Sequence, residues 1–337
     1  MKNNILFICG SLNQTSMMHK ISMHLADYNC WFSPYYADGI VAYFSKTSVL
    51  NFSILGGQFR KRTIDYILSN NLQLDAGGKD RYYDLVVTCS DLIMPKNILK
   101  SKIILVQEGM TDPENIMFYL VKYLKLPRWI ASTSTTGLSN QYDIFCVASE
   151  GYKNLFIRKG ILSSKVIVTG IPNFDDCTDY INNNFPYKDY VLAATSDSRE
   201  TFKFENRKKF IAKVNRIASG RKIIFKLHPN EFVERATEEI NKYSPGATVL
   251  SHGNTEQMIA NCSVLVTRYS TCAYVGLILG KEVYSEFDVK ELNKLLPIQN
   301  GGISDYNIAV AARSLLGDTV RKNYPGRTNT LQRIKNK

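Results

Sequence analysis

The sequence predicts an α/β protein of two domains, each built on a largely parallel sheet. The first observation is length, because 337 residues exceed one typical domain and suggest roughly two. The second is the alternation of short buried apolar runs with stretches of helical spacing, which is typical of βαβ units. The third is the polar, turn-rich segment Asp179–Lys188, which indicates a linker between two such series.

The first series begins with a strand over Asn4–Cys9, a turn at Gly10-Ser11 and a helix over Thr15–Ala26, an order typical of a Rossmann-like domain. Helices are also expected over Asn115–Leu124 and Gly151–Lys159. Further strands are expected over Asp84–Thr88, Lys102–Val106, Ile144–Ala148 and Lys165–Thr169. We expect this domain to span residues 1–175. The GxGxxG fingerprint is absent, so no dinucleotide cofactor is expected.

The second series repeats the alternation over residues 186–320, which predicts a second Rossmann-like domain. Its expected strands are Tyr190–Thr195, Lys222–Leu227, Thr248–Ser251, Val264–Arg268 and Glu282–Ser285. Its expected helices are Lys203–Ala218, Phe232–Tyr243, Thr255–Asn261, Thr271–Leu279, Val289–Leu295 and Asn307–Leu316. Residues 321–337 form a tail with basic and no acidic residues. This tail indicates contact with an anionic membrane surface, or a solvated chain end.

Composition narrows the class of protein. A formal charge of +12 favours an acidic partner, or a surface biased toward lysine. No RNA-binding aromatic motif is present, so nucleic acid is not an expected partner. Seven scattered cysteines without a CxxC pair fit a reducing cytosol, and no apolar run is long enough to span a membrane. We therefore expect a cytoplasmic protein, peripheral on the inner face of the cell membrane through its tail.

Two strand ends in the second domain are followed by residues suited to bind a ligand. The strand Lys222–Leu227 stops at His228-Pro229, and Lys226 shares a face with His228 because strand side chains alternate. The strand Val264–Arg268 is followed by Ser270-Thr271 and an apolar helix. Open α/β sheets bind ligands at the carboxyl ends of their strands. A basic ring at one end and hydroxyls at the other predict a pocket for a phosphorylated ligand.

Two Rossmann-like halves facing a central cleft, with an anion site in the second half, are the GT-B plan of nucleotide-sugar glycosyltransferases. Within it, Gln107-Glu108-Gly109, His228-Pro229 and Ser270-Thr271 resemble, in order, three short signatures of bacterial sialyltransferases, polysialyltransferases and Kdo transferases. Gln107 departs from the pattern, which has an acid at that position. The resemblance implies transfer of a sialic acid-like or Kdo-like sugar from a CMP-activated donor to a surface glycan or glycolipid.

The resemblance also implies roles for single residues. Glu108 is the expected general base for the acceptor hydroxyl of an inverting transfer, with Asp112 and Glu114 as alternatives. These acids could instead cap the helix that starts near Asn115. His228 is the expected stabiliser of the leaving nucleotide.

Further contacts are expected on both domains. The residues expected to contact the nucleotide are Lys226, Pro229, Ser270, Thr271, Thr195, Ser196 and Glu256. Those expected to contact acceptor or sugar are Gly10, Ser11, His19, Gly109 and Asp112. No DxD pair follows a strand, so no catalytic metal is expected.

Four alternatives stay open. A UDP-sugar glycosyltransferase would share every feature above. A UDP-N-acetylglucosamine 2-epimerase has the same fold, but its usual His-x-Glu-x-Gly element is not found. A polyol-phosphate transferase also uses strand-end histidines and a basic surface. A non-catalytic binder of anionic polymer is permitted by the charge.

Overall fold

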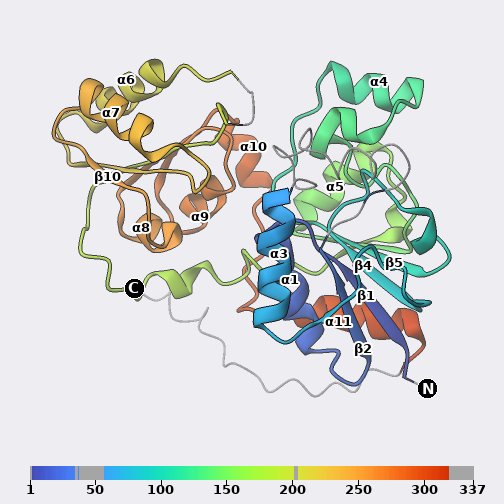
Figure 1. The fold of residues 1–337 in the computed structure, drawn as a ribbon. Helices are drawn as coiled ribbons and strands as arrows, with labels where there is room; N and C mark the ends of the chain where they lie inside the picture. Colours follow the sequence, from blue (N-terminus) through green and yellow to red (C-terminus); the bar gives the residue numbers. More distant parts are fainter. Residues whose placement is uncertain (1, 35–36, 38–56, 201–203, 319–337) are drawn as a thin grey trace, which may run out of the picture. The chain divides into compact units, whose positions relative to one another are not determined.

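The computed structural model describes residues 2–34, 37, 57–200 and 204–318 (Figure 1). The chain divides into two compact units: unit 1 is Met1–Asp176 with Pro297–Lys337, and unit 2 is Cys177–Leu296. The predicted basic tail, residues 321–337, lies outside the described residues. No helix within the described ranges is long and apolar enough to cross a membrane.

Unit 1 is built on a parallel sheet of seven strands within the described residues, in the order β3-β2-β1-β4-β5-β6-β7. Its strands are β1 (Asn4–Ile8), β2 (Asn29–Ser33), β3 (Gln73–Leu74), β4 (Leu85–Thr88), β5 (Lys102–Val106), β6 (Ile144–Val147) and β7 (Val166–Val168). The sequence order reverses between β1 and β4, which pair in parallel. Such a reversal leaves a crevice at the carboxyl ends of the two strands.

The helices of unit 1 bury apolar faces against this sheet or against neighbouring helical segments. They are α1 (Leu12–Met23), α3 (Gly57–Ser69), α4 (Ile116–Leu124), α5 (Glu150–Lys159) and α11 (Ser304–Leu316), with short 3₁₀ turns at η2 (Lys96–Ile98), η3 (Arg128–Thr135) and η4 (Ser163–Lys165). The predicted second domain included α11. In the structure, Ile308 and Ala312 of α11 share one buried cluster with Phe7 and Met17. An apolar helix face is stable only where it is covered, and unit 1 covers this one.

Unit 2 is built on a parallel sheet of five strands among the described residues, in the order β10-β9-β8-β11-β12. Its strands are β8 (Val191–Ala194), β9 (Ile223–Lys226), β10 (Thr248–Leu250), β11 (Val264–Val266) and β12 (Glu282–Tyr284). Its helices are α6 (Arg207–Ala218), α7 (Val233–Tyr243), α8 (Thr255–Asn261), α9 (Cys272–Ile278) and α10 (Val289–Lys294), with a 3₁₀ turn at η5 (Cys177–Tyr180). The order reverses between β8 and β11.

The predicted class, α/β with two parallel-sheet Rossmann-like domains, is confirmed. The predicted strands differ from the observed ones by at most two residues at either end, and β5 matches its predicted bounds. The strands β2 and β3 and the helix α3 were not predicted. β2 reads Asn-Cys-Trp-Phe-Ser, with neither alternation nor a β-branched run to mark it. Its pairing with β1 makes it a strand.

Candidate functional site

In unit 1, polar groups gather at the carboxyl ends of β1 and β5, beside the point where strand order reverses. Glu108 follows β5 and is half-buried. Its Oε1 accepts from the Ser11 hydroxyl at 3.3 Å, and its Oε2 accepts from the Gln14 amide at 2.6 Å. The predicted residues Glu108 and Ser11 are therefore in direct contact. Gln14, which sequence reasoning missed, is the nearer donor.

The first turn of α1 fixes both donors. The Ser11 hydroxyl caps the helix by accepting from the Gln14 N–H at 3.2 Å. The backbone around it is held by two hydroxyls: Thr15 donates to the Ser11 carbonyl at 2.7 Å, and Thr63 donates to the Gly10 carbonyl at 3.2 Å. The carboxylate of Glu108 thus lies at a helix N-terminus, where negative charge is favoured. A carboxylate held on one side only by neutral donors keeps lone pairs with which to accept a proton.

Gln107 explains the departure from the acidic-acidic-Gly signature. Its side chain is buried, its Nε2 donates to the Gly109 carbonyl at 2.7 Å, and its Oε1 accepts from the Ala148 N–H at 2.9 Å. An ionised carboxylate only accepts, so it would leave the Gly109 carbonyl unpaired. Gln107 fixes the strand-end turn that presents Glu108.

Two predicted acceptor-binding residues lie apart from Glu108. His19 is two turns along α1 from Ser11, and its Nδ1 lies 3.1 Å from the Tyr66 hydroxyl. Burial lowers the pKa of this imidazole. Asp112 accepts from the Thr133 hydroxyl at 2.7 Å, while its own N–H donates to the same oxygen at 2.9 Å. Asp112 therefore holds η3 in place.

The predicted helix cap at Asp112 is wrong. Asn115 caps α4, because its Oδ1 accepts from the Phe118 N–H at 3.1 Å. Glu114 is exposed and accepts from the Tyr119 hydroxyl at 3.2 Å.

In unit 2, the strand ends of β8 and β9 meet through Glu231. The His228 N–H donates to the Thr195 hydroxyl at 3.0 Å and to the Glu231 carboxylate at 2.9 Å. The Thr195 hydroxyl in turn donates to Glu231. Thr195 and Glu231 are both buried. Thr195 thus serves to position the turn at His228, and the sequence signal for its partner is an acid three residues after the histidine.

The ring of His228 is partly exposed, and its polar neighbours among the described residues lie at Nδ1. The Asn230 N–H donates to Nδ1 at 3.3 Å, and Asp197 Oδ2 lies 3.6 Å from the same nitrogen. These contacts orient the ring through one nitrogen. The other nitrogen, Nε2, is the one with which the ring can reach a phosphate oxygen.

A buried charge network supports this edge of the sheet. Arg207 lies between two acids: it pairs with Glu231, and its Nε is 2.6 Å from Glu205. Glu205 is also 3.1 Å from Arg268 and accepts from the Ser196 hydroxyl at 2.9 Å. The side chains of Arg207, Glu205 and Glu231 are each at most 3% exposed. Sequence reasoning missed the network, because Glu231 and Arg268 are distant in the chain from Glu205 and Arg207.

The other residues predicted to contact the nucleotide differ in the hydrogen bonds that they already make within the protein. Lys226 is buried, and its ammonium donates to the carbonyls of Leu227 at 2.7 Å and Ser251 at 3.2 Å. Burial lowers the pKa of this lysine. Lys226 therefore stabilises the ends of β9 and β10. The hydroxyl of Ser270 accepts from the Cys272 N–H at 3.3 Å. Thr271, Glu256 and Pro229 lie in the segments that follow β11, β10 and β9.

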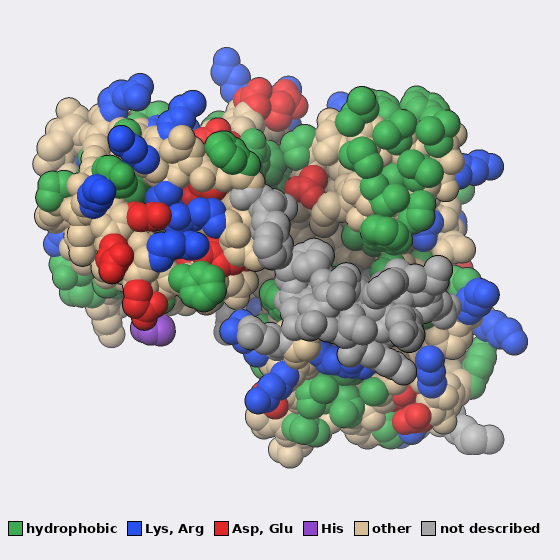
Figure 2. Space-filling view, turned by 45° about the horizontal axis from the view of Figure 1, so that its top comes forward, with side chains coloured by type: hydrophobic (Ala, Val, Ile, Leu, Met, Phe, Trp, Pro, Cys, Tyr) green, Lys and Arg blue, Asp and Glu red, His purple; other side chains and the backbone are tan. Residues whose placement is uncertain are grey.

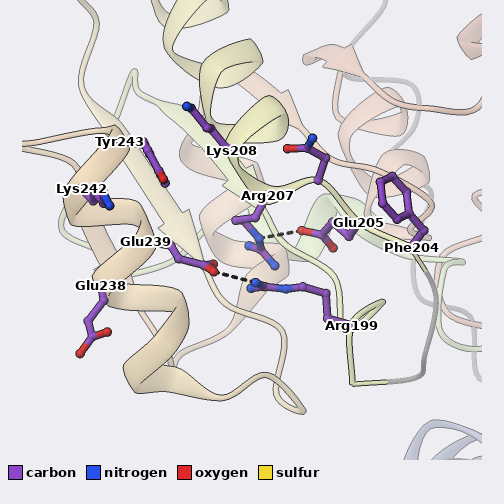
Figure 3. A pocket seen from close by; sticks show the side chains of 10 residues that line it. Arg199, Phe204, Glu205, Arg207, Lys208, Glu238, Glu239, Lys242 and Tyr243 are labelled. Atoms are coloured by element: carbon purple, nitrogen blue, oxygen red, sulfur yellow. Dashed lines mark hydrogen bonds and ion pairs between the residues drawn. The ribbon is translucent and has the colours of Figure 1, made fainter.

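A pocket of about 490 Å³ lies on unit 2 beside α6 and α7 (Figure 3). Two ion pairs cross it, Arg199 with Glu239 at 2.8 Å and Arg207 with Glu205 at 2.6 Å. None of the predicted site residues lines this pocket. It shares only Glu205 and Arg207 with the charge network described above, and the charged side chains of Lys208, Lys242 and Glu238 also line it.

Comparison with known proteins identifies the fold. No protein-family model and no curated protein matches the sequence. Among solved structures, the chain is similar to UDP-GlcNAc 2-epimerase from Neisseria meningitidis bound to UDP-GlcNAc, with a TM-score of 0.56, 14% identity, and coverage of 94% of this chain and 100% of that one.

Two further solved structures have a similar architecture. The wall teichoic acid polymerase TagF, as its H444N variant, has a TM-score of 0.51 and 11% identity, covering 94% of this chain and 89% of that one. Anabaena HepE in complex with UDP and glucose has a TM-score of 0.50 and 10% identity, covering 94% and 99%. At such identities the likeness shows the fold alone. The chain has the GT-B fold, and none of these neighbours is one of the sialyltransferases or Kdo transferases that its short motifs resemble.

Proposed function

We propose that this protein is a glycosyltransferase that uses a UDP-linked sugar. The observation that carries the proposal is Glu108, a half-buried carboxylate at a strand end, held by Ser11 and Gln14 without a cationic partner among the described residues. Such a group is suited to accept a proton. The preference for UDP over the CMP donor implied by the motifs is supported by two neighbours whose structures contain UDP-GlcNAc or UDP.

In the proposed reaction each unit supplies one part of the chemistry. Glu108 takes the proton of the acceptor hydroxyl while that oxygen forms a bond to the anomeric carbon of the sugar. The bond between the anomeric carbon and the phosphate oxygen breaks, and UDP leaves. The Nε2–H of His228 donates to a phosphate oxygen of the departing nucleotide and stabilises its charge. The acceptor we propose is a surface glycan or glycolipid.

A transferase is favoured over a 2-epimerase by the surroundings of Glu108. Among the described residues, Glu108 accepts from Ser11 and Gln14, while Asp112 accepts from Thr133 and His19 lies in hydrogen-bond contact with Tyr66. An epimerase that removes and returns a proton on the sugar ring needs more than one acid–base group at the same place. Among the described residues, no cluster of three or more histidine, cysteine or acidic side chains forms a metal-binding group.

The first test is a nucleotide panel followed by thermal unfolding. UDP should raise the melting temperature and CMP and CDP should not, because a ligand that binds only the folded state stabilises it by about 2.7 kcal/mol at a hundredfold excess over Kd. Stabilisation by CMP alone would restore the sialic acid-like donor. Stabilisation by CDP alone would support polyol-phosphate transfer. Stabilisation by none of the three would contradict a nucleotide-sugar enzyme.

The second test separates the base from its neighbours. Glu108→Gln should lower kcat for UDP release in the presence of acceptor by about 10²–10⁴-fold and leave the UDP-induced melting shift unchanged. Glu114→Gln is the matched control, because Glu114 is an exposed acid of the same segment bonded to Tyr119. Full activity in Glu108→Gln would exclude it as the base. Isomerisation of UDP-N-acetylglucosamine without acceptor, followed by NMR, would support the epimerase instead.

A further inference from the structure

The segment from α4 to η3 exposes a large apolar surface on unit 1. Figure 2 shows hydrophobic side chains gathered on the face where α4 lies in Figure 1. The exposed side chains of this α4 surface are Ile116, Tyr119, Tyr123, Leu124, Leu126 and Trp129. Ile116, Tyr123 and Leu124 are each more than 60% exposed. A contiguous apolar patch on a folded protein indicates an interaction site.

The side chains of the α4 surface are not part of the buried core of unit 1. α4 buries Phe118 and Val121 on its inner face, and that burial is what anchors the helix. Its outer face repeats apolar residues at Ile116, Tyr119 and Tyr123, the spacing of a second stripe along the same helix. The rings of Tyr119 and Tyr123 are parallel, with centroids 6.4 Å apart. α4 is thus apolar on both faces.

Positive charge borders the α4 surface. Lys122 and Lys125 are exposed, and Arg128 donates through Nε to the Asp91 carbonyl at 2.9 Å. Residues 115–129 include no aspartate or glutamate, and the nearest acid before them is the exposed Glu114, which accepts from the Tyr119 hydroxyl. The Lys122 ammonium lies 5.8 Å from the ring centroids of Phe118 and Tyr123, so its stem lies along apolar surface.

The chain turns sharply where α4 ends. Lys125 takes the left-handed conformation at φ 53°, and the Leu126-Pro127 step leads into η3. This turn leads from α4 into η3, which packs against α4 and carries the exposed Trp129. Aromatic, aliphatic and basic side chains are therefore held together by a folded element.

We propose that the α4 surface docks unit 1 onto an anionic lipid bilayer, with α4 lying in the interface. Tyrosine and tryptophan favour the boundary between headgroups and acyl chains, and lysine and arginine favour anionic headgroups. α4 has nine residues, a length of about 14 Å, whereas a bilayer core is about 30 Å thick. The helix can lie on a membrane and cannot span one.

A second copy of the chain fits this surface less well. A two-fold contact through α4 would bring Lys122 and Lys125 of one copy near the same residues of the other, and like charges repel. Protein interfaces are also depleted of lysine. An anionic bilayer matches both the apolar and the cationic part of the surface, and the net charge of +12 favours the same partner.

Vesicle flotation with the full chain tests the proposal, which does not depend on the nucleotide. We expect the protein to float with equimolar phosphatidylcholine–phosphatidylglycerol vesicles and to stay behind with phosphatidylcholine alone. The variant Tyr123→Ser/Leu124→Ser/Trp129→Ser should lose about tenfold or more in partition coefficient, because it removes three apolar anchors. Lys122→Gln/Lys125→Gln should remove the preference for phosphatidylglycerol.

The matched control changes exposed apolar residues elsewhere on unit 1. Met23→Ser/Leu68→Ser/Tyr82→Ser removes side chains that are 58%, 58% and 62% exposed, and its partition should equal that of the parent chain. Melting temperatures of all variants, with and without UDP, check that folding and the proposed nucleotide site are intact. Each variant is also made in a chain that ends at Asp318, which separates the α4 surface from the basic tail.

Several outcomes would overturn the proposal. The parent chain could fail to float with either vesicle, or the α4 variant could float as well as the parent. The control variant could lose as much as the α4 variant, or the tail deletion alone could abolish flotation. Sedimentation could also show a dimer without lipid that the α4 variant converts to monomer while flotation is unchanged. That result would make the surface a contact between copies.

Discussion

The two units hold their polar strand ends by different means. In unit 1, Glu108 is held by a hydroxyl and an amide, and the turn that contains it is held by the amide of Gln107. In unit 2, the His228 turn is held by Glu231, whose charge is matched by Arg207. The difference separates two uses of a carboxylate. An acid paired with a buried arginine is a structural support, whereas an acid held by neutral donors has no cation to compete with a substrate proton.

The largest loss of stability is expected in the charge network of unit 2. Arg207→Met should lower the free energy of unfolding by about 3–5 kcal/mol, because it leaves Glu205 and Glu231 buried without their shared cation. Urea titration followed by circular dichroism measures the change. Lys294→Met is the control: Lys294 pairs with Glu291 on the surface, both more than half exposed, and should cost at most about 1 kcal/mol. Equal losses in the two variants would contradict a structural role for the network.

A negative charge at Gln107 of unit 1 should destabilise the protein, because this buried side chain donates a hydrogen bond. Gln107→Glu should destabilise the protein by about 1–3 kcal/mol, because the carboxylate cannot donate to the Gly109 carbonyl and is buried beside it. The same urea titration measures this loss. Gln141→Glu, at an exposed glutamine of unit 1, is the control and should have little effect. A Gln107→Glu chain as stable as the parent would show that an acid is acceptable here.

Unit 1 also contains a buried cation, Lys159, whose contacts differ from those of Arg207 in unit 2. Lys159 donates to the Ser134 carbonyl at 2.9 Å and lies 5.5 Å from the Phe118 ring centroid. Burial lowers its pKa to about 8. Between about pH 8 and the unfolded value of 10.5, the unfolded chain binds more protons, so stability rises with pH. Below that window both states are protonated, and this lysine contributes no slope.

The variant Lys159→Met should lose the rise in unfolding free energy that the parent chain shows in this pH window. The difference in unfolding free energy between the parent and this variant should change by up to about 1.4 kcal/mol per pH unit within the window. Unfolding titrations at pH 8 and at pH 10 measure it. Lys153→Met, on the more exposed side of α5, should leave the parent's pH dependence in place. If the difference in unfolding free energy between the parent and Lys159→Met is the same at pH 8 and pH 10, the pKa of Lys159 is not lowered by burial.

Sequence patterns predicted most of the parallel strands, because buried apolar runs bounded by turn residues are local signals. β5 and α8 match their predicted bounds fully. β2 and β3 escaped prediction, since short edge-side strands depend on pairing with a neighbour more than on their own residues. The same reason moved α11 into unit 1. Its apolar face was readable in the sequence, but the surface that covers it was not.

The candidate site divides in the same way. The sequence by itself determined which residues end the strands, and so placed Glu108, His228, Thr195 and Ser270 at the carboxyl edges of two sheets. Only the tertiary structure decided which of them are free. It bonded Lys226 to carbonyls, tied Thr195 to Glu231 and gave Glu108 the neutral donor Gln14. Local sequence sets backbone conformation within a few residues, whereas the partner of a polar side chain depends on which distant segments the fold brings to it.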